Sequence, residues 1–193
     1  MTSSRSKSLP DIGFMTVVES AEHGFFGGYL VLNQTGRPLE FHCTAPVRPN
    51  RAQEILYGPT LKPYLYGEQI GKTLWSQTKN VPRIVCTDMA EILHVRQFMA
   101  CPVVLLGARG DLPLDTSAAT DMSRLDTAHA GTAPPHTDQL RSFRAGDYAL
   151  AVPAAYPDDE PIVIQQCKLL GASFDLHEPV DRIRHAIQEA QLQ

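Results

Sequence analysis

The first 44 residues contain three strand-like segments whose connections are too short for neighbouring strands to run parallel. Residues 13–20 and 27–33 are rich in β-branched and aromatic side chains, and residues 38–44 follow a turn around Gly36. A parallel pair needs a crossover of about a dozen residues or more, so these segments predict an antiparallel meander.

A strand–helix–strand unit follows further along the chain. Residues 83–87 and 101–106 are strand-like, and Asp88 with Glu91 three residues later predicts a capped helix between them. Two strands joined in this way should be parallel with a right-handed crossover. Residues 143–152 predict a further strand or hairpin.

Helical segments fill much of the rest. Asn50 and Gln53 have capping-box spacing before a short helix, and residues 60–79 predict a longer one in which Gly67 and Gly71 allow close approach of another backbone. A final helix begins near Glu178 and carries an apolar stripe. The predicted fold is therefore α/β, with a mixed sheet of about five to six strands and helices packed on the sheet.

This order of elements resembles the ribonuclease-H-like architecture. The resemblance implies that carboxylates at the ends of the first and fourth strands converge on a divalent metal. Those positions are Glu19 and Asp88, and Asp175, Glu178 or Asp181 on later segments could complete the site. Oxygen ligands suit Mg²⁺ or Mn²⁺, which can stabilise the attacking and leaving oxygens of a phosphodiester.

Each of these carboxylates also has a structural interpretation. Asp88 could serve only as the cap of the helix that follows it, and Glu19 could simply be a solvated side chain at a polar turn. Asp175 or Glu178 could complement the helix dipole at the start of the last helix.

Composition divides the chain into one domain and two unstructured segments. Residues 1–11 are polar and Ser-rich and predict a disordered tail, and residues 12–193 form a single α/β domain. Within it, residues 108–140 are rich in Ala, Thr, Gly, Pro and Asp and predict a flexible insertion.

Charge and cysteine usage limit the partners and the compartment. The net charge is −4, so no global positive field draws the chain to nucleic acid, and we expect none as a partner. The cysteines are widely spaced, and no segment has the length of about 20 apolar residues that a membrane span requires. We expect a soluble cytoplasmic protein with free thiols.

Glu40 and His42 form a second candidate site on the third strand. Alternation places them on one face and Phe41 and Cys43 on the other. If Phe41 and Cys43 face the core, Glu40 and His42 face outward as an acid–base pair or part of a binding surface, or merely as polar residues of a half-exposed strand.

The segment after the third strand interleaves aromatic and basic residues. Its candidate ligand-binding side chains are Arg48, Arg51, Tyr57, Tyr64 and Tyr66. Such a combination can contact a nucleotide or an acidic segment of a partner, although tyrosines of a broken core helix would give the same pattern.

Three hypotheses on function follow. The first is a binding or interaction module that uses this segment, without metal or cofactor, for a ligand, a protein partner or a second copy of the chain. The alternative is a metal-dependent phosphodiester hydrolase that uses Glu19 and Asp88. A third is a subunit of a larger assembly.

Overall fold

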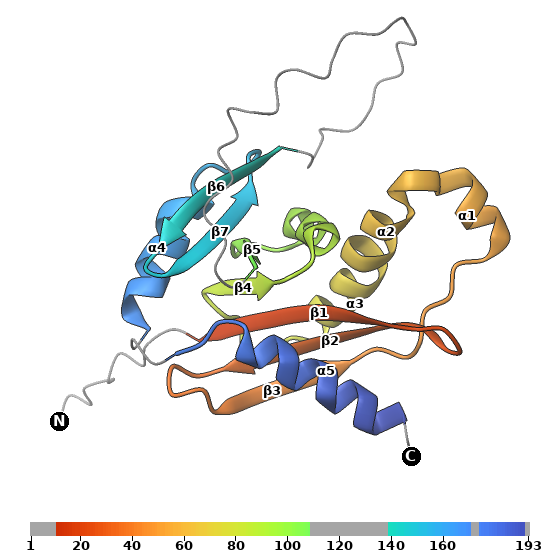
Figure 1. The fold of residues 1–193 in the computed structure, drawn as a ribbon, viewed down its shortest axis with the longest axis horizontal. Coiled ribbons are helices and arrows are strands. Elements are labelled where there is room, and N and C mark those ends of the chain that lie inside the picture. The colour runs from red at the N-terminus through yellow and green to blue at the C-terminus, as the bar shows by residue number, and fades with distance from the viewer. Residues whose placement is uncertain (1–10, 109–138, 171–173, 192–193) are drawn as a thin grey trace, which may run out of the picture.

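The computed structural model describes residues 11–108, 139–170 and 174–191, and they form an α/β fold around one mixed sheet (Figure 1). The predicted tail (residues 1–11) and insertion (108–140) lie outside the described residues except at their boundaries. The elements, in chain order, are β1 (Ile12–Ser20), β2 (Gly24–Leu32), β3 (Pro38–Cys43), α1 (Arg51–Tyr57), η1 (Gly58–Thr60), α2 (Leu61–Pro63), η2 (Tyr64–Gly71), α3 (Lys72–Ser76), β4 (Ile84–Thr87), η3 (Ala90–Phe98), β5 (Val103–Leu106), β6 (Leu140–Ala145), β7 (Tyr148–Pro153), α4 (Asp159–Leu169) and α5 (Glu178–Gln191).

The strands of the described residues form a seven-stranded sheet in the order β3-β2-β1-β4-β5-β7-β6. The meander is antiparallel and β4 is parallel to β5, as predicted. β4 is also parallel to β1, its neighbour on the other side. The sheet has seven strands rather than five or six, because the segment predicted as a strand or a hairpin (residues 143–152) is a hairpin, β6–β7. Helical segments connect β3 to β4 and β4 to β5, which confirms the expected element order.

Alternating side chains of the strands build two separate cores. Ile12, Phe14 and Leu30 belong to the core on the side of the sheet covered by α4 and α5, which we call the α5 face. Figure 1 shows α5 lying alongside β1, β2 and β3. Met15 and Val17 point to the opposite side, which is covered by η2 and η3 and which we call the η2 face. A side chain on β1 therefore belongs to one core or the other according to its parity.

Adjacent glycines on β2 let helices approach both faces. A Cβ atom on Gly27 would lie 2.1 Å from Cγ2 of Ile70 in η2, and one on Gly28 would lie 2.2 Å from Cγ2 of Ile183 in α5. Neither position has room for a larger side chain.

The helical segment on the η2 face is irregular, and the sequence explains why. Pro59 and Pro63 lack the N–H that a continuous helix needs, and residues 64–71 are π-helical. The predicted close approach at Gly67 is confirmed, since a Cβ there would lie 2.5 Å from Cβ of His94 in η3. The predicted capping box of α1 is also confirmed, with Asn50 and Gln53 exchanging hydrogen bonds.

The prediction that Asp88 caps the helix after β4 is wrong. Residues 90–98 form a 3₁₀ segment that begins after Met89 without a side-chain cap. The Met89 N–H is instead accepted by Thr87 Oγ1 at 3.2 Å, and the carboxylate of Asp88 points elsewhere. Among the described residues, no helix combines the length and apolarity needed to cross a bilayer.

Candidate functional site at the carboxyl edge of β1 and β4

The sheet topology singles out one edge. From the centre of the sheet the chain continues outward through β2 and β3 on one side of β1, and through β5 on the other side of β4. The gap between β1 and β4 is therefore a topological switch point, where open α/β sheets bind ligands beyond the carboxyl ends of their strands. Because β1, β4 and β5 are parallel, their carboxyl ends lie at the same edge.

Asp88 directly follows β4 at this edge and lies on the α5 face. The β1–β4 register pairs Phe14 with Cys86, and two residues further on the Thr16 hydroxyl donates a hydrogen bond to Asp88 Oδ1 at 2.9 Å. The other carboxylate oxygen, Oδ2, accepts a hydrogen bond from Nη2 of Arg184 in α5. Thr16 is fully buried, whereas the Asp88 side chain is 21% exposed.

Arg184 brings a second carboxylate into this cluster. Its Nη1 lies 3.2 Å from Oδ1 of Asp181, one helical turn earlier in α5. Asp181 is therefore connected to Asp88 through one guanidinium, whereas Asp175 accepts the His177 N–H and Glu178 pairs with Arg182. We call Thr16, Asp88, Asp181 and Arg184 the switch-point cluster.

Glu19 lies at the same edge but on the η2 face. Its Oε1 accepts hydrogen bonds from Tyr66 Oη at 2.5 Å and from Lys62 Nζ at 2.9 Å. These bonds, that of Tyr66 first, lower the pKa of Glu19 from its ordinary value. Glu19 and Asp88 are thus separated by the sheet, and each has hydrogen-bond and cationic partners of its own.

Glu40 and His42 lie on the side of β3 opposite to the one expected. Phe41 is 44% exposed and Cys43 is also exposed, so the outward-facing pair is the apolar one. The physical reason is that Glu40 accepts backbone N–H bonds from Lys79 and Asn80, in addition to its 2.5 Å contact with His42 Nε2. Glu40 thus holds the loop before β4 against β3 by hydrogen bonds to its backbone.

The aromatic and basic segment is divided between core and surface. Tyr66 is fully buried, while the ring of Tyr57 stacks on Tyr64 with centroids 4.2 Å apart. Arg48 donates to the His23 carbonyl oxygen and Arg51 pairs with Glu54. The structure therefore brings Tyr57 and Tyr64 together, whereas Tyr66 lies in the core and each arginine has a partner of its own.

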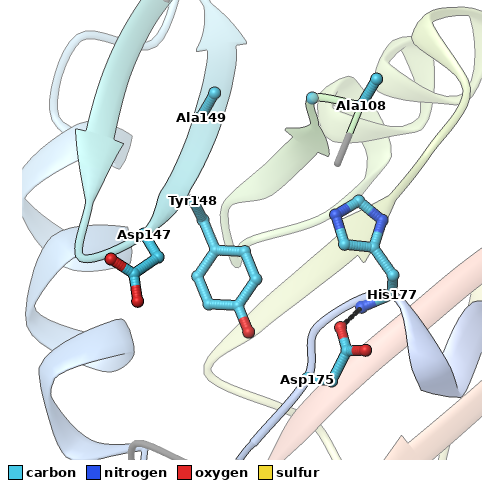
Figure 2. A pocket seen from close by; sticks show the side chains of 7 residues that line it. Ala108, Asp147, Tyr148, Ala149, Asp175 and His177 are labelled. Atoms are coloured by element: carbon cyan, nitrogen blue, oxygen red, sulfur yellow. Dashed lines mark hydrogen bonds between the residues drawn. The ribbon is translucent and has the colours of Figure 1, made fainter. Parts of the chain in front are cut away.

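A small cavity of about 190 Å³ lies near the end of β5 on the α5 face (Figure 2). Figure 2 shows Tyr148 and His177 projecting toward it, with Asp175 below them. The hydroxyl of Tyr148 is already used, because it donates to the Phe174 carbonyl oxygen at 2.7 Å and accepts the Leu176 N–H at 3.3 Å. This arrangement orients the segment that leads into α5.

Sequence reasoning found Asp88 and named Asp181, but it missed Thr16 and Arg184. Thr16 is the one polar side chain within the buried part of β1 (residues 12–17), which is a usable signal. Arg184 follows Ile183 of the apolar stripe of α5, so its position beside the sheet could have been inferred only once the helix was placed on that face.

Comparisons with known proteins identify a fold similarity only. No family model and no curated protein matches the chain. Among solved structures, the catalytic domain of human endonuclease V is similar over 96% of this chain and 85% of that chain, with 14% identity and a TM-score of 0.43. A second structure of human endonuclease V covers 96% and 87%, with 12% identity and a TM-score of 0.42.

Endonuclease V of Ciona intestinalis in complex with inosine-containing DNA is similar over 54% of this chain and 48% of that chain, with 12% identity and a TM-score of 0.35. Such values are too low to transfer residues or activity. What the chain does therefore has to be inferred from its own side chains.

Proposed function

We propose that this chain is a metal-dependent phosphodiester hydrolase that works at the carboxyl edge of β1 and β4. The observation that carries the proposal is the place of Asp88, beside β1 at the switch point, with Asp181 connected to it through Arg184. A binding edge of an open α/β sheet that presents carboxylates is a suitable place for a metal-assisted reaction.

The switch-point cluster offers carboxylate oxygens, which are the type of ligand that a hard divalent cation prefers. Mg²⁺ is commonly held by one or two carboxylates, with water and substrate phosphates as its other ligands. Asp88 and Asp181 would hold it, and Thr16 would orient Asp88. Within the described residues no group of three or more His, Cys, Asp or Glu side chains forms a ready metal site, so the site would use two carboxylates.

A bound divalent ion would supply charge stabilisation and activation of water at the phosphodiester. The chain's own contribution is to fix the carboxylate of Asp88 through the buried hydroxyl of Thr16. Lys62 on the η2 face and Arg184 on the α5 face place cationic groups on both sides of the edge, where a phosphate would approach. Glu19, already bonded to Tyr66 and Lys62, would act by orienting Lys62.

The test is cleavage of labelled single- and double-stranded DNA and RNA oligonucleotides with Mn²⁺ or Mg²⁺, by the wild type and by Asp88→Asn. We expect wild-type cleavage and a loss of at least about 100-fold in the variant, the scale on which removing one essential charge-stabilising group acts. Glu178→Gln is the matched control. Glu178 lies in α5, the helix that carries Asp181, but it is exposed and pairs with Arg182 instead of Arg184. Wild-type protein that cleaves none of these substrates would contradict the proposal.

A second candidate function is an interaction module, and α1 supports it. None of its residues is buried, Ile55 is 67% exposed and Leu56 is 81% exposed, and the Tyr57–Tyr64 stack continues this apolar surface. Figure 1 shows α1 at the far end of the helical segment from the sheet. Sedimentation of the wild type and of Leu56→Ser tests self-association: a wild-type dimer that the variant cannot form supports this function, and a monomeric wild type argues against a homo-oligomer.

A further inference from the structure

Arg184 lies between the two carboxylates of the switch-point cluster. One nitrogen of its guanidinium contacts Asp88 and the other contacts Asp181. An arginine side chain stays protonated under all physiological conditions, so this cation is permanent. One of the two negative charges of Asp88 and Asp181 is therefore already balanced without any metal.

We infer that Arg184 sets the affinity of this edge for divalent cations by competing for the oxygens of Asp88 and Asp181. The inference rests on the proposed function. It assigns to Arg184 the role of an internal counter-ion: a metal ion can bind Asp88 only as the guanidinium leaves it. Tight binding of the metal ion then requires further favourable contacts. The phosphates of a bound substrate would supply them, as ligands of the metal and as hydrogen-bond acceptors for the released guanidinium.

The exposure of the three side chains supports displacement. The Arg184 side chain is 35% exposed and that of Asp181 is 55% exposed, so a released guanidinium can move into solvent without leaving a buried charge. Asp88, at 21% exposure, would keep the hydrogen bond from Thr16 and remain in place. The Arg96–Asp159 pair is the contrasting case: the two side chains are 14% and 3% exposed, so separating them would leave a buried charge.

The neighbouring arginine of the same helix provides a matched control. Arg182 is 38% exposed, pairs with Glu178 and donates to the Gly36 carbonyl oxygen, but the structure gives it no contact with Asp88. Its replacement removes the same charge from α5 and leaves the switch-point cluster intact. A comparison of Arg184→Gln with Arg182→Gln therefore separates competition at the carboxylates from a general change in net charge.

The experiment measures Mn²⁺ binding to the full chain by the electron paramagnetic resonance of free Mn²⁺, without substrate. We expect Arg184→Gln to bind Mn²⁺ about ten- to a hundred-fold more tightly than wild type, as removal of a charge-assisted contact predicts. Arg182→Gln should match wild type, and Arg184→Gln with Asp88→Asn should lose the gain. Arg184→Lys, which keeps the charge but not the fork of donors, should fall between wild type and Arg184→Gln.

Other results would separate the two proposals. Equal Asp88-dependent binding by wild type and Arg184→Gln, or weaker binding by Arg184→Gln, overturns the inference on Arg184 and leaves the proposed hydrolase standing. Absence of Mn²⁺ binding in every protein, with and without an oligonucleotide, overturns both. Far-UV circular dichroism confirms that each variant is folded, and if Arg184→Gln is not, the comparison of Arg184→Lys with wild type decides.

Discussion

On the α5 face of the sheet, Asp88 meets a buried hydroxyl and an arginine that is shared with a second carboxylate. On the η2 face, Glu19 meets a lysine and the hydroxyl of a buried tyrosine, and within the described part of the chain that lysine pairs with no second carboxylate. Both carboxylates lie at the same edge, yet only the first belongs to a cluster with two acidic side chains. The difference identifies the α5 face as the one on which to look for metal-dependent chemistry.

The same two faces differ in how their helices are built. α5 is a regular helix whose apolar stripe packs on the sheet, with Val180, Ile183 and Ile187 buried. The η2 face is covered by a segment that changes helix type repeatedly and contacts η3 closely at Gly67 and Gly71. The η2 segment is therefore held by η3 as well as by the sheet, whereas α5 packs on the sheet through the side chains of one regular helix.

The largest effect is expected from breaking the ion pair that joins elements of the two faces. Arg96 of η3 donates from Nε and Nη2 to both carboxylate oxygens of Asp159 in α4, at 2.7 and 3.0 Å. Asp159→Ala should lower the free energy of unfolding by about 3–5 kcal/mol, because it leaves Arg96 largely buried without its partner. Urea denaturation measures the change.

The exposed pair Arg141–Glu160 is the control, with 55% and 22% exposure. Glu160→Gln should cost less than about 1 kcal/mol. Equal costs for the two variants would show that the two faces are not joined through Arg96.

A smaller effect should distinguish the packing of the faces. Gly27→Ala forces a Cβ against Ile70 of η2, and Gly28→Ala forces one against Ile183 of α5. Overpacking costs about 1–3 kcal/mol, and we expect Gly27→Ala to be the more costly because η2 is held against η3 and cannot retreat. Urea denaturation of both variants tests the ranking, and a greater loss in Gly28→Ala would reverse the assignment of rigidity.

Replacing acidic side chains of the η2 face should have effects that depend on pH. Burial alone would raise the pKa of Glu40, but the bonds from His42, Lys79 and Asn80 outweigh it and lower the pKa to about 2. The folded state thus favours the carboxylate, so its stabilisation is present above the ordinary pKa of 4.5 and is lost as pH falls toward 2. Glu40→Gln should cost about 1–3 kcal/mol at pH 7.

The cost of Glu40→Gln should shrink through the same acidic range, which thermal unfolding at several pH values would follow. Glu19→Gln provides the comparison, since the pKa of Glu19 is also lowered but its side chain is 51% exposed. Its cost should stay below about 1 kcal/mol. A cost for Glu40→Gln that does not change between neutral and acidic pH would mean that the loop before β4 is held by other contacts.

The parts of the fold that the sequence predicted are those with local causes. Short connections predicted the meander, and the strand–helix–strand spacing predicted the parallel pair β4–β5. The stripe of α5 predicted its buried residues. The helix types between β3 and β4 could not be predicted, because Pro63 and the packing at Gly67 compete with local helix propensity.

The candidate site was predicted only in part for a similar reason. The position of Asp88 at the end of a strand is a local feature, and the order of elements placed it beside β1. Which β1 side chain meets Asp88 is decided by the alternation of side chains along the strand. Thr16 faces α5, whereas Glu19, three residues later, faces η2. The contact with Arg184 depends on where α5 lies along the sheet, which no local pattern specifies. The reversed orientation of β3 likewise depends on Glu40 meeting a distant loop.

The distances along the chain within the switch-point cluster have a consequence for biosynthesis. Thr16 and Asp88 are separated by 72 positions, and Asp88 and Arg184 by 96. Translation delivers β1 and β4 long before α5, so a nascent chain has Asp88 without its arginine and the apolar residues of the α5 face without their cover. The same helix that neutralises Asp88 also covers that core, so the edge reaches its resting charge state only as the fold is completed.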